Sequence, residues 1–245
     1  MIPYRDDNPL FRTPIATLGL ILANLAAWLV IERAGDPTAV AISVCELGLI
    51  PGELLQRVPQ GAIVQLGNGA ACVLGTSSTW FTPVTSMFLH GGWEHLLSNM
   101  WFLWLFGNNV EDSMGRGAYL MFYLLCGLGA ALLQTAIQPD SVLPMVGASG
   151  AISGVMGAYV VLYPRIRVHM FTIILVIPWA FTLPAFLMIG YWFLLQLIGG
   201  LVSSAQAGGV AFWAHVGGFL AGVVLLPWFR NPALVAQHRR LAAWA

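Results

Sequence analysis

The sequence predicts an all-α membrane protein, a bundle of six transmembrane helices with both termini in the cytoplasm. Of the 245 residues, 58% are hydrophobic and only 8% are charged, whereas about 25% of the residues of soluble domains are charged. Six apolar stretches each approach the length of about 20 residues that crosses a bilayer. The arginines gather on one side of those stretches.

The six predicted spans are separated by charged residues, glycines and prolines. The first span is not followed by a cleavage site of small residues, so we expect a retained anchor and not a cleaved signal peptide. The fifth span contains Pro178 and Pro184 and is expected to be kinked or partly a loop. In order, the spans are residues 14–33, 83–107, 118–137, 148–164, 168–200 and 211–229.

The arginines predict the orientation, because short cytoplasmic loops carry an excess of them. Arg33 and Arg57 fall on one side of the six spans, and the other eight arginines fall on the opposite side. We therefore expect a cytoplasmic N-terminal tail (1–13), a membrane domain (14–229) and a cytoplasmic C-terminal tail (230–245). The eight cytoplasmic arginines are Arg5, Arg12, Arg116, Arg165, Arg167, Arg230, Arg239 and Arg240.

The segment 34–78 is then an outer loop. Its prolines, glycines and leucines predict a folded loop that lies partly in the membrane, and no second domain or repeat is visible. Cys45 and Cys72 both fall in this loop. Whether they pair depends on an oxidising compartment, and the sequence leaves the question open.

Ser149 and His215 are polar side chains in apolar spans, where such groups are costly and are often functional. Ser149 lies 16 residues before Arg165, and His215 lies 15 residues before Arg230. At about 1.5 Å per helical residue, both lie roughly 22–24 Å above the cytoplasmic edge of the membrane. A serine beside an imidazole at one depth is the minimal apparatus of nucleophilic acyl transfer.

Small residues near both side chains allow their helices to approach closely. A purely structural interpretation also exists, in which the glycines only pack, Ser149 bonds its own helix, and His215 bonds a carbonyl or serves a proton path. The small residues are Gly147, Gly150, Gly154 and Gly157 in the fourth span, and Gly218 and Gly222 in the sixth.

The second span adds His95 and Asn99, which are four residues apart and therefore lie on one helix face. Their donors, together with the backbone N–H of Ser149, are suited to an oxyanion hole. A metal site at His90 and His95 is the weaker interpretation, since no cysteine is near and Glu94 lies on another face. His90 precedes the helix and has a structural alternative as well.

Taken together, these motifs resemble the rhomboid family of intramembrane serine proteases, over most of the chain. The matching motifs are His90, His95-xxx-Asn99, Glu111-Asp112-Ser113-Met114-Gly115, Gly147-Ala148-Ser149-Gly150 and Ala214-His215-xx-Gly218-xxx-Gly222.

The resemblance implies a six-helix rhomboid-like bundle with a Ser149–His215 dyad and no acidic third member. It implies cleavage of transmembrane segments of membrane proteins near the outer leaflet, with substrate access beside the fifth span and with no metal or other cofactor. His95 and Asn99 would help to form the oxyanion hole. Glu111 would anchor the turn after the second span, unless it is an ordinary interfacial acid near Arg116.

Two positions depart from the family pattern. The Trp-Arg pair of the first outer loop is not evident, because Gln56 precedes Arg57 and Trp80 has no adjacent arginine. Ser153 stands where relatives often have an aromatic ring against the catalytic histidine, so the orientation of His215 is open.

Two other classes of function are alternatives to a protease. A non-proteolytic rhomboid-like protein would bind transmembrane helices without cutting them. A transporter would need acidic residues well inside the spans, and Glu94 lies only near one end of its span. We expect transmembrane substrates and the lipid bilayer as partners, no nucleic acid, and a location in a bacterial cytoplasmic membrane.

Overall fold

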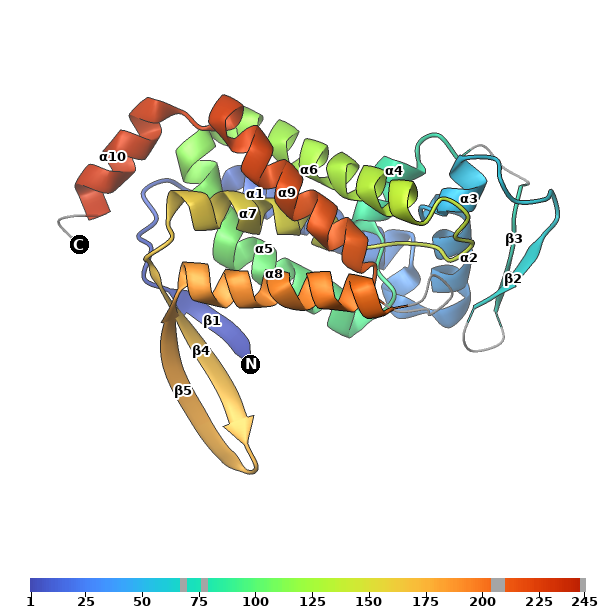
Figure 1. The fold of residues 1–245 in the computed structure, drawn as a ribbon, viewed down its shortest axis with the longest axis horizontal. Helices are drawn as coiled ribbons and strands as arrows, with labels where there is room; N and C mark the ends of the chain where they lie inside the picture. The colour runs from blue at the N-terminus through green and yellow to red at the C-terminus, as the bar shows by residue number, and fades with distance from the viewer. Residues whose placement is uncertain (67–69, 76–78, 204–209, 243–245) are drawn as a thin grey trace.

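A computed structural model describes residues 1–66, 70–75, 79–203 and 210–242. The fold is mostly helical, and α7 (Ser149–Leu162) lies at its centre, packed against α5 (Trp93–Met114), α6 (Arg116–Ile137) and α9 (Phe212–Phe229) (Figure 1). Every residue of α7 from Gly150 to Tyr159 is buried. The outer members of the bundle are α1 (Ile15–Val30) and α8 (Ala185–Val202).

Glycines allow a close backbone contact between α7 and α9. A Cβ atom added to Gly218 would lie 1.9 Å from the carbonyl oxygen of Gly150. A Cβ atom added to Gly222 would lie 2.0 Å from the carbonyl oxygen of Gly154. The two backbones therefore touch directly along one helix face.

Three of the described helices are long and apolar enough to cross a membrane, namely α6, α8 and α9. The helices α1, with 16 residues, and α7, with 14, are apolar but shorter. The structure thus has the character of a membrane protein.

One end of the bundle carries the segment between α1 and α5 (Figure 1). A disulfide joins Cys45 to Cys72 there, which answers the question that the sequence leaves open. Residues 67–69 and 76–78 of the predicted outer loop, and residues 243–245 of the predicted C-terminal tail, lie outside the described part of the chain. The elements of this segment are η1 (Arg33–Gly35), α2 (Pro37–Leu47), α3 (Pro51–Leu54), β2 (Ile63–Gln65), β3 (Ala71–Val73), α4 (Thr82–Thr85) and η3 (Ser86–Phe88).

The opposite end carries α10 (Pro232–Ala242) and a three-stranded antiparallel sheet in the order β1-β4-β5. Its strands are β1 (Ile2–Asp6), β4 (Arg167–Ile174) and β5 (Ile177–Pro184). The sheet shows that the fold is mostly helical and not all-α as predicted. The predicted N-terminal tail also contributes a strand, because β1 pairs with β4.

The predicted fifth span, 168–200, is helical only from Ala185. In its first half Val168 and Met170 are buried while Phe171 is exposed, the alternation of a strand. Pro184 ends β5 and is the N-cap residue of α8. The apolar run 168–200 therefore contains strands, whose side chains alternate between two faces, followed by a helix.

The predicted second span, 83–107, also has different bounds. The helix α5 begins at Trp93, after Gly91 and Gly92, and continues to Met114. The earlier residues form the short helical turns α4 and η3. The other predicted spans agree with α1, α6, α7 and α9 to within a few residues at each end.

Candidate active site

Ser149 is the first residue of α7 and is half-buried. The chain enters the helix through Gly147, whose φ of +124° is a conformation that L side chains rarely adopt. A Cβ atom at Gly147 would also lie 2.7 Å from His95 Nε2. Glycine at this position therefore permits the turn and leaves room for the neighbouring imidazole.

His215 lies in the first turn of α9, and its Nε2 is 2.7 Å from Ser149 Oγ. The close contact of α7 and α9 holds the two side chains at this hydrogen-bond distance. An imidazole nitrogen beside a hydroxyl group is the arrangement in which a base removes the hydroxyl proton.

The other ring nitrogen, His215 Nδ1, is 2.7 Å from Gln196 Oε1 of α8. The ring of Trp192, one helical turn before Gln196, lies 5.8 Å from the imidazole centroid at an interplanar angle of 37°. Sequence reasoning did not find these two residues. Their signal was an amide and an indole four residues apart in an otherwise apolar span.

His95 and Asn99 come from α5 and border the turn before Ser149. An added Cβ at Gly147 would lie 2.7 Å from His95 Nε2 and 3.5 Å from Asn99 Nδ2. His95 Nδ1 accepts a hydrogen bond of 3.4 Å from Gly91 N, which leaves Nε2 to carry the proton. Among the described residues Asn99 Nδ2 has no hydrogen-bond partner although it is buried.

A cavity of about 1640 Å³ joins these groups. Its lining includes the side chains that carry chemistry, Ser149, His215, His95 and Asn99, and it extends beneath the segment that holds the disulfide. Two protein donors thus face the same space as a serine hydroxyl and a histidine base.

Comparison with known proteins identifies the family. The model of the rhomboid domain matches residues 77–231. The chain belongs to the rhomboid family. The matched residues include both the Ser149–His215 pair and the donors of α5.

Three relatives illustrate the similarity. The chain is 41% identical over 75 residues to "Rhomboid-like protein 11, chloroplastic" of Arabidopsis thaliana, covering 31% of this chain and 26% of the relative. It is 28% identical over 164 residues to "Rhomboid protein 1, mitochondrial" of Saccharomyces cerevisiae, covering 64% and 44%. It is 39% identical over 88 residues to "Rhomboid protease GluP" of Bacillus subtilis, covering 35% and 17%. Each match thus spans less than half of the relative's length.

Ser153, the departure noted in the sequence, does not contact the imidazole of this rhomboid. Its hydroxyl group donates a 2.6 Å hydrogen bond to the carbonyl oxygen of Ser149, within α7. The aromatic ring beside His215 is instead that of Trp192, from α8.

His90 and Glu32 form the entrance to α5. The backbone N–H of His90 donates to Glu32 Oε1 at 2.8 Å, and both residues are buried. The His90 ring packs edge-on against that of His95, with centroids 5.1 Å apart. In this rhomboid the ring of His90 therefore packs against the ring of His95 and restrains its position.

Glu111 lies near the far end of α5, away from the serine. Its carboxylate accepts hydrogen bonds from the backbone N–H groups of Ala16 and Thr17, at 3.0 and 2.8 Å, and from the Thr17 hydroxyl group at 2.8 Å. These donors lie in the first turn of α1, where unpaired N–H groups and the helix dipole attract an anion. The side chain of Glu111 thus holds the start of α1, while its backbone carbonyl oxygen accepts a 2.7 Å hydrogen bond from the N–H of Gly115, the C-cap residue of α5.

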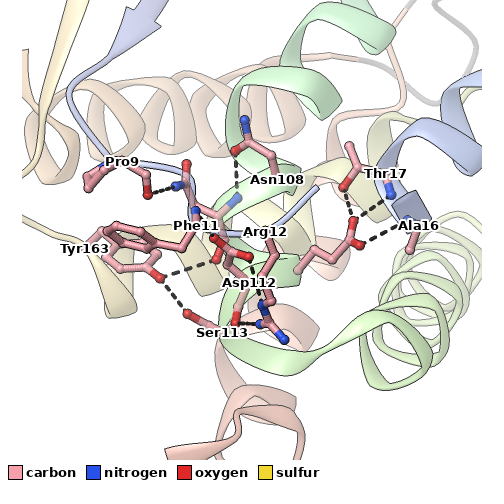
Figure 2. A network of polar contacts seen from close by, with 11 residues as sticks. Pro9, Phe11, Arg12, Ala16, Thr17, Asn108, Asp112, Ser113 and Tyr163 are labelled. Atoms are coloured by element: carbon pink, nitrogen blue, oxygen red, sulfur yellow. Dashed lines mark hydrogen bonds and ion pairs between the residues drawn. The ribbon is translucent and has the colours of Figure 1, made fainter. Parts of the chain in front are cut away.

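Neighbouring side chains complete this network (Figure 2). Asp112 accepts from the backbone N–H of Phe11 and pairs with the guanidinium group of Arg12. Ser113 bonds the hydroxyl group of Tyr163, at 2.5 Å. The polar residues of this motif therefore fix the N-terminal segment and α7 to α5, at the end of the bundle opposite the serine.

Proposed function

We propose that this rhomboid is an intramembrane serine endopeptidase in which Ser149 is the nucleophile and His215 the general base. The observation that carries the proposal is the 2.7 Å contact between Ser149 Oγ and His215 Nε2, beside unused donors in a shared cavity. The relatives named as proteases, such as GluP of Bacillus subtilis, support the same reaction.

In the first half of the proposed reaction, Ser149 Oγ attacks a peptide carbonyl carbon while His215 Nε2 takes the hydroxyl proton. The negative charge that develops on the carbonyl oxygen is stabilised by Asn99 Nδ2, His95 Nε2 and the backbone N–H of Ser149. The helical position of Ser149 supports the last role, because the first N–H groups of a helix have no acceptor within it.

In the second half, His215 gives the proton to the leaving amine as the carbon–nitrogen bond breaks, leaving an acyl-enzyme. Water then attacks the ester carbon while His215 Nε2 accepts its proton. The bond between that carbon and Ser149 Oγ breaks, the carboxylic acid leaves, and His215 returns the proton to Ser149 Oγ. Gly147, Gly150, Gly218 and Gly222 act in this scheme only by letting α7, α9 and the α5 side chains approach.

We propose six membrane spans, formed by α1, α5, α6, α7, α8 and α9, with both termini in the cytoplasm. The arginines that flank these helices support this orientation. Arg116 begins α6, Arg165 follows α7 and Arg230 follows α9, whereas Ser149 and His215 stand at the opposite ends of α7 and α9. The site then opens toward the outer leaflet, from which water and a transmembrane substrate can reach it.

The membrane that holds the protein is proposed to be a bacterial cytoplasmic membrane. The orientation of the arginines supports a cytoplasmic face at one end. The relatives come from mitochondria and chloroplasts as well as from Bacillus subtilis, so they do not select among these membranes.

A cleavage assay in liposomes tests the proposal. The purified protein is mixed with a single-pass substrate whose transmembrane helix contains helix-breaking residues near the outer face, and products are sized by mass spectrometry. We expect one cut near that face with the wild type and none with Ser149→Ala. Substrate that co-purifies uncut with the folded wild type would contradict the proposal and favour a non-proteolytic helix-binding protein.

A further inference from the structure

Gln196 is a buried amide in the apolar helix α8. Only 9% of its surface is exposed, and its neighbours along the helix are mainly leucine, isoleucine and glycine. A polar side chain inside a membrane helix usually needs a partner from another helix. The partner of Gln196 is the imidazole of His215.

The hydrogen bonds of Gln196 fix which way its amide faces. Its Nε2 donates to the carbonyl oxygen of Trp192, at 3.4 Å, and its Oε1 lies 2.7 Å from His215 Nδ1. An amide oxygen only accepts, so Nδ1 must carry the proton. His215 Nε2 is then unprotonated and faces Ser149 Oγ, as a general base must.

Trp192 restrains the same imidazole from its face. Because Trp192 and Gln196 are four residues apart, they lie on one side of α8. The indole ring, at 5.8 Å, limits the tilt of the imidazole, while the amide limits its rotation. Both restraints thus come from α8, whereas Ser153 of α7 is engaged with its own helix.

We propose that Gln196 is a positioning residue that holds His215 in the tautomer and orientation needed to accept the proton of Ser149. This inference rests on the proposed function and adds a third member to the dyad, a neutral amide where a triad has an acid. Since the amide carries no charge, it orients the imidazole without stabilising the imidazolium as a carboxylate does.

The contacts of His215 with Gln196 and Trp192 depend on the position of α8. Only 28% of the α8 span is buried within the protein, the lowest share of the three long apolar helices among the described residues, since α9 has 33% and α6 has 44%. If α8 moves away from α9, His215 loses the amide and the indole together. The orientation of the base is therefore coupled to the position of this peripheral helix.

The test compares Gln196→Leu and Gln196→Glu with the wild type, using the rate of labelling by a fluorophosphonate probe as a function of pH. Gln196→Leu should slow labelling by about 10- to 100-fold, as when the orienting partner of a ligating histidine is removed. Gln196→Glu should retain labelling at neutral pH, because a carboxylate accepts from Nδ1 in the same way. Its acidic limb should move to higher pH, because the carboxylate favours the protonated ring.

Leu194→Ala, at an exposed position of the same helix, is the control and should label like the wild type. With a peptide substrate, Gln196→Leu should lower kcat and leave KM unchanged. A wild-type rate and pH profile for both Gln196 variants would overturn the positioning role. A wild type that is folded and unlabelled would instead contradict the proposed function itself, so the two failures are distinct.

An independent observation concerns the hairpin of β4 and β5. No acidic or basic residue other than His169 lies between Arg167 and Ala185, and the turn residues Leu175 and Val176 are 92% and 88% exposed. Figure 1 shows that the hairpin leaves the bundle sideways, away from the run of the helices. Its exposed apolar residues include Ile173, Ile177 and Trp179.

We infer that this hairpin lies in the headgroup region of the cytoplasmic leaflet, with its turn reaching the acyl chains. Arg165 and Arg167 are exposed at its base, where they complement anionic headgroups. The strand β1 pairs only with residues 168–171 of β4. The remaining edges have open backbone groups, which need water or headgroups and are not tolerated in the hydrocarbon core.

Spin labels at Val176→Cys and, as a control, at the exposed Asp140→Cys test this placement, both in a Cys126→Ala background and in vesicles of phosphatidylcholine and phosphatidylglycerol. The Val176 site should collide with oxygen and be shielded from a water-soluble nickel complex, and the Asp140 site should show the reverse. Nickel collisions equal at both sites would contradict the lipid contact. Dipolar broadening at Val176 would show a second copy in its place and would also overturn it.

Discussion

The contact of Gly218 with Gly150 makes the packing of α7 against α9 directly testable by Gly218→Ala. The new Cβ would lie 1.9 Å from Gly150 O and 2.8 Å from its carbonyl carbon, whereas unstrained carbon contacts are about 3.5–4.0 Å. The obstructing atoms belong to the backbone and cannot rotate away. The helices must therefore separate by more than about 1 Å at this point.

This separation should lower the stability of the fold and lengthen the contact between Ser149 and His215. Overpacking of this kind destabilises a protein by about 1–3 kcal/mol, and each kcal/mol lowers Tm by about 2–4 °C in a chain of this size. Ser149 adjoins Gly150, and His215 lies one turn before Gly218. An added separation of about 1 Å would lengthen the 2.7 Å contact of Oγ with Nε2 beyond hydrogen-bond range.

The assay pairs thermal unfolding in detergent with labelling by a serine-reactive fluorophosphonate. Gly190→Ala in α8 is the matched control, because an added Cβ there meets nothing within 4 Å. We expect Gly218→Ala to unfold at a lower temperature and to lose labelling, and Gly190→Ala to match the wild type. A Gly218→Ala protein with wild-type Tm and labelling would refute the reasoning.

Three further substitutions test other parts of the structure. Asn99→Ala should lower kcat by about 10²–10³ in a cleavage assay, the usual loss for one oxyanion donor, and a wild-type rate would remove Asn99 from that role. Glu111→Gln should lower Tm, since the amide cannot accept as strongly from the N–H groups of Ala16 and Thr17; an unchanged Tm would contradict the anchor. Burial raises the pKa of Asp6 to about 6, although a hydrogen bond from Tyr159 offsets part of this. The folded protein then binds the extra proton, so the stability from this group is complete below about pH 4 and is lost as the pH rises through 6. Asp6→Asn should flatten that part of the Tm profile, and an unaltered slope would exclude Asp6 as its source.

The helices with uniform apolar character and charged or glycine-rich ends were predictable from the sequence. Residues 118–137 and 211–229 correspond closely to α6 and α9. The hairpin of β4 and β5 was not predictable, because hydropathy alone cannot distinguish an apolar strand from an apolar helix. Pro178 and Pro184 marked the interruption without revealing its conformation.

Only some residues of the candidate site were predictable from the sequence. Ser149 and His215 were found because polar groups in apolar helices are conspicuous and their distances from flanking arginines match. Gln196 and Trp192 were missed, since their contact with the imidazole depends on the rotation of α8 about its axis, which no local pattern specifies. The pairing of Cys45 with Cys72 likewise depends on how α2 and β3 are arranged in space.

Labelling of the purified protein by a fluorophosphonate probe, compared among the wild type, Ser149→Ala and His215→Ala, tests the central claim most directly. The account predicts that the wild type forms a covalent adduct on Ser149 and that neither variant is labelled, while all three unfold at similar temperatures. Equal labelling of the wild type and Ser149→Ala, or no labelling of a folded wild type that admits the probe, would contradict it.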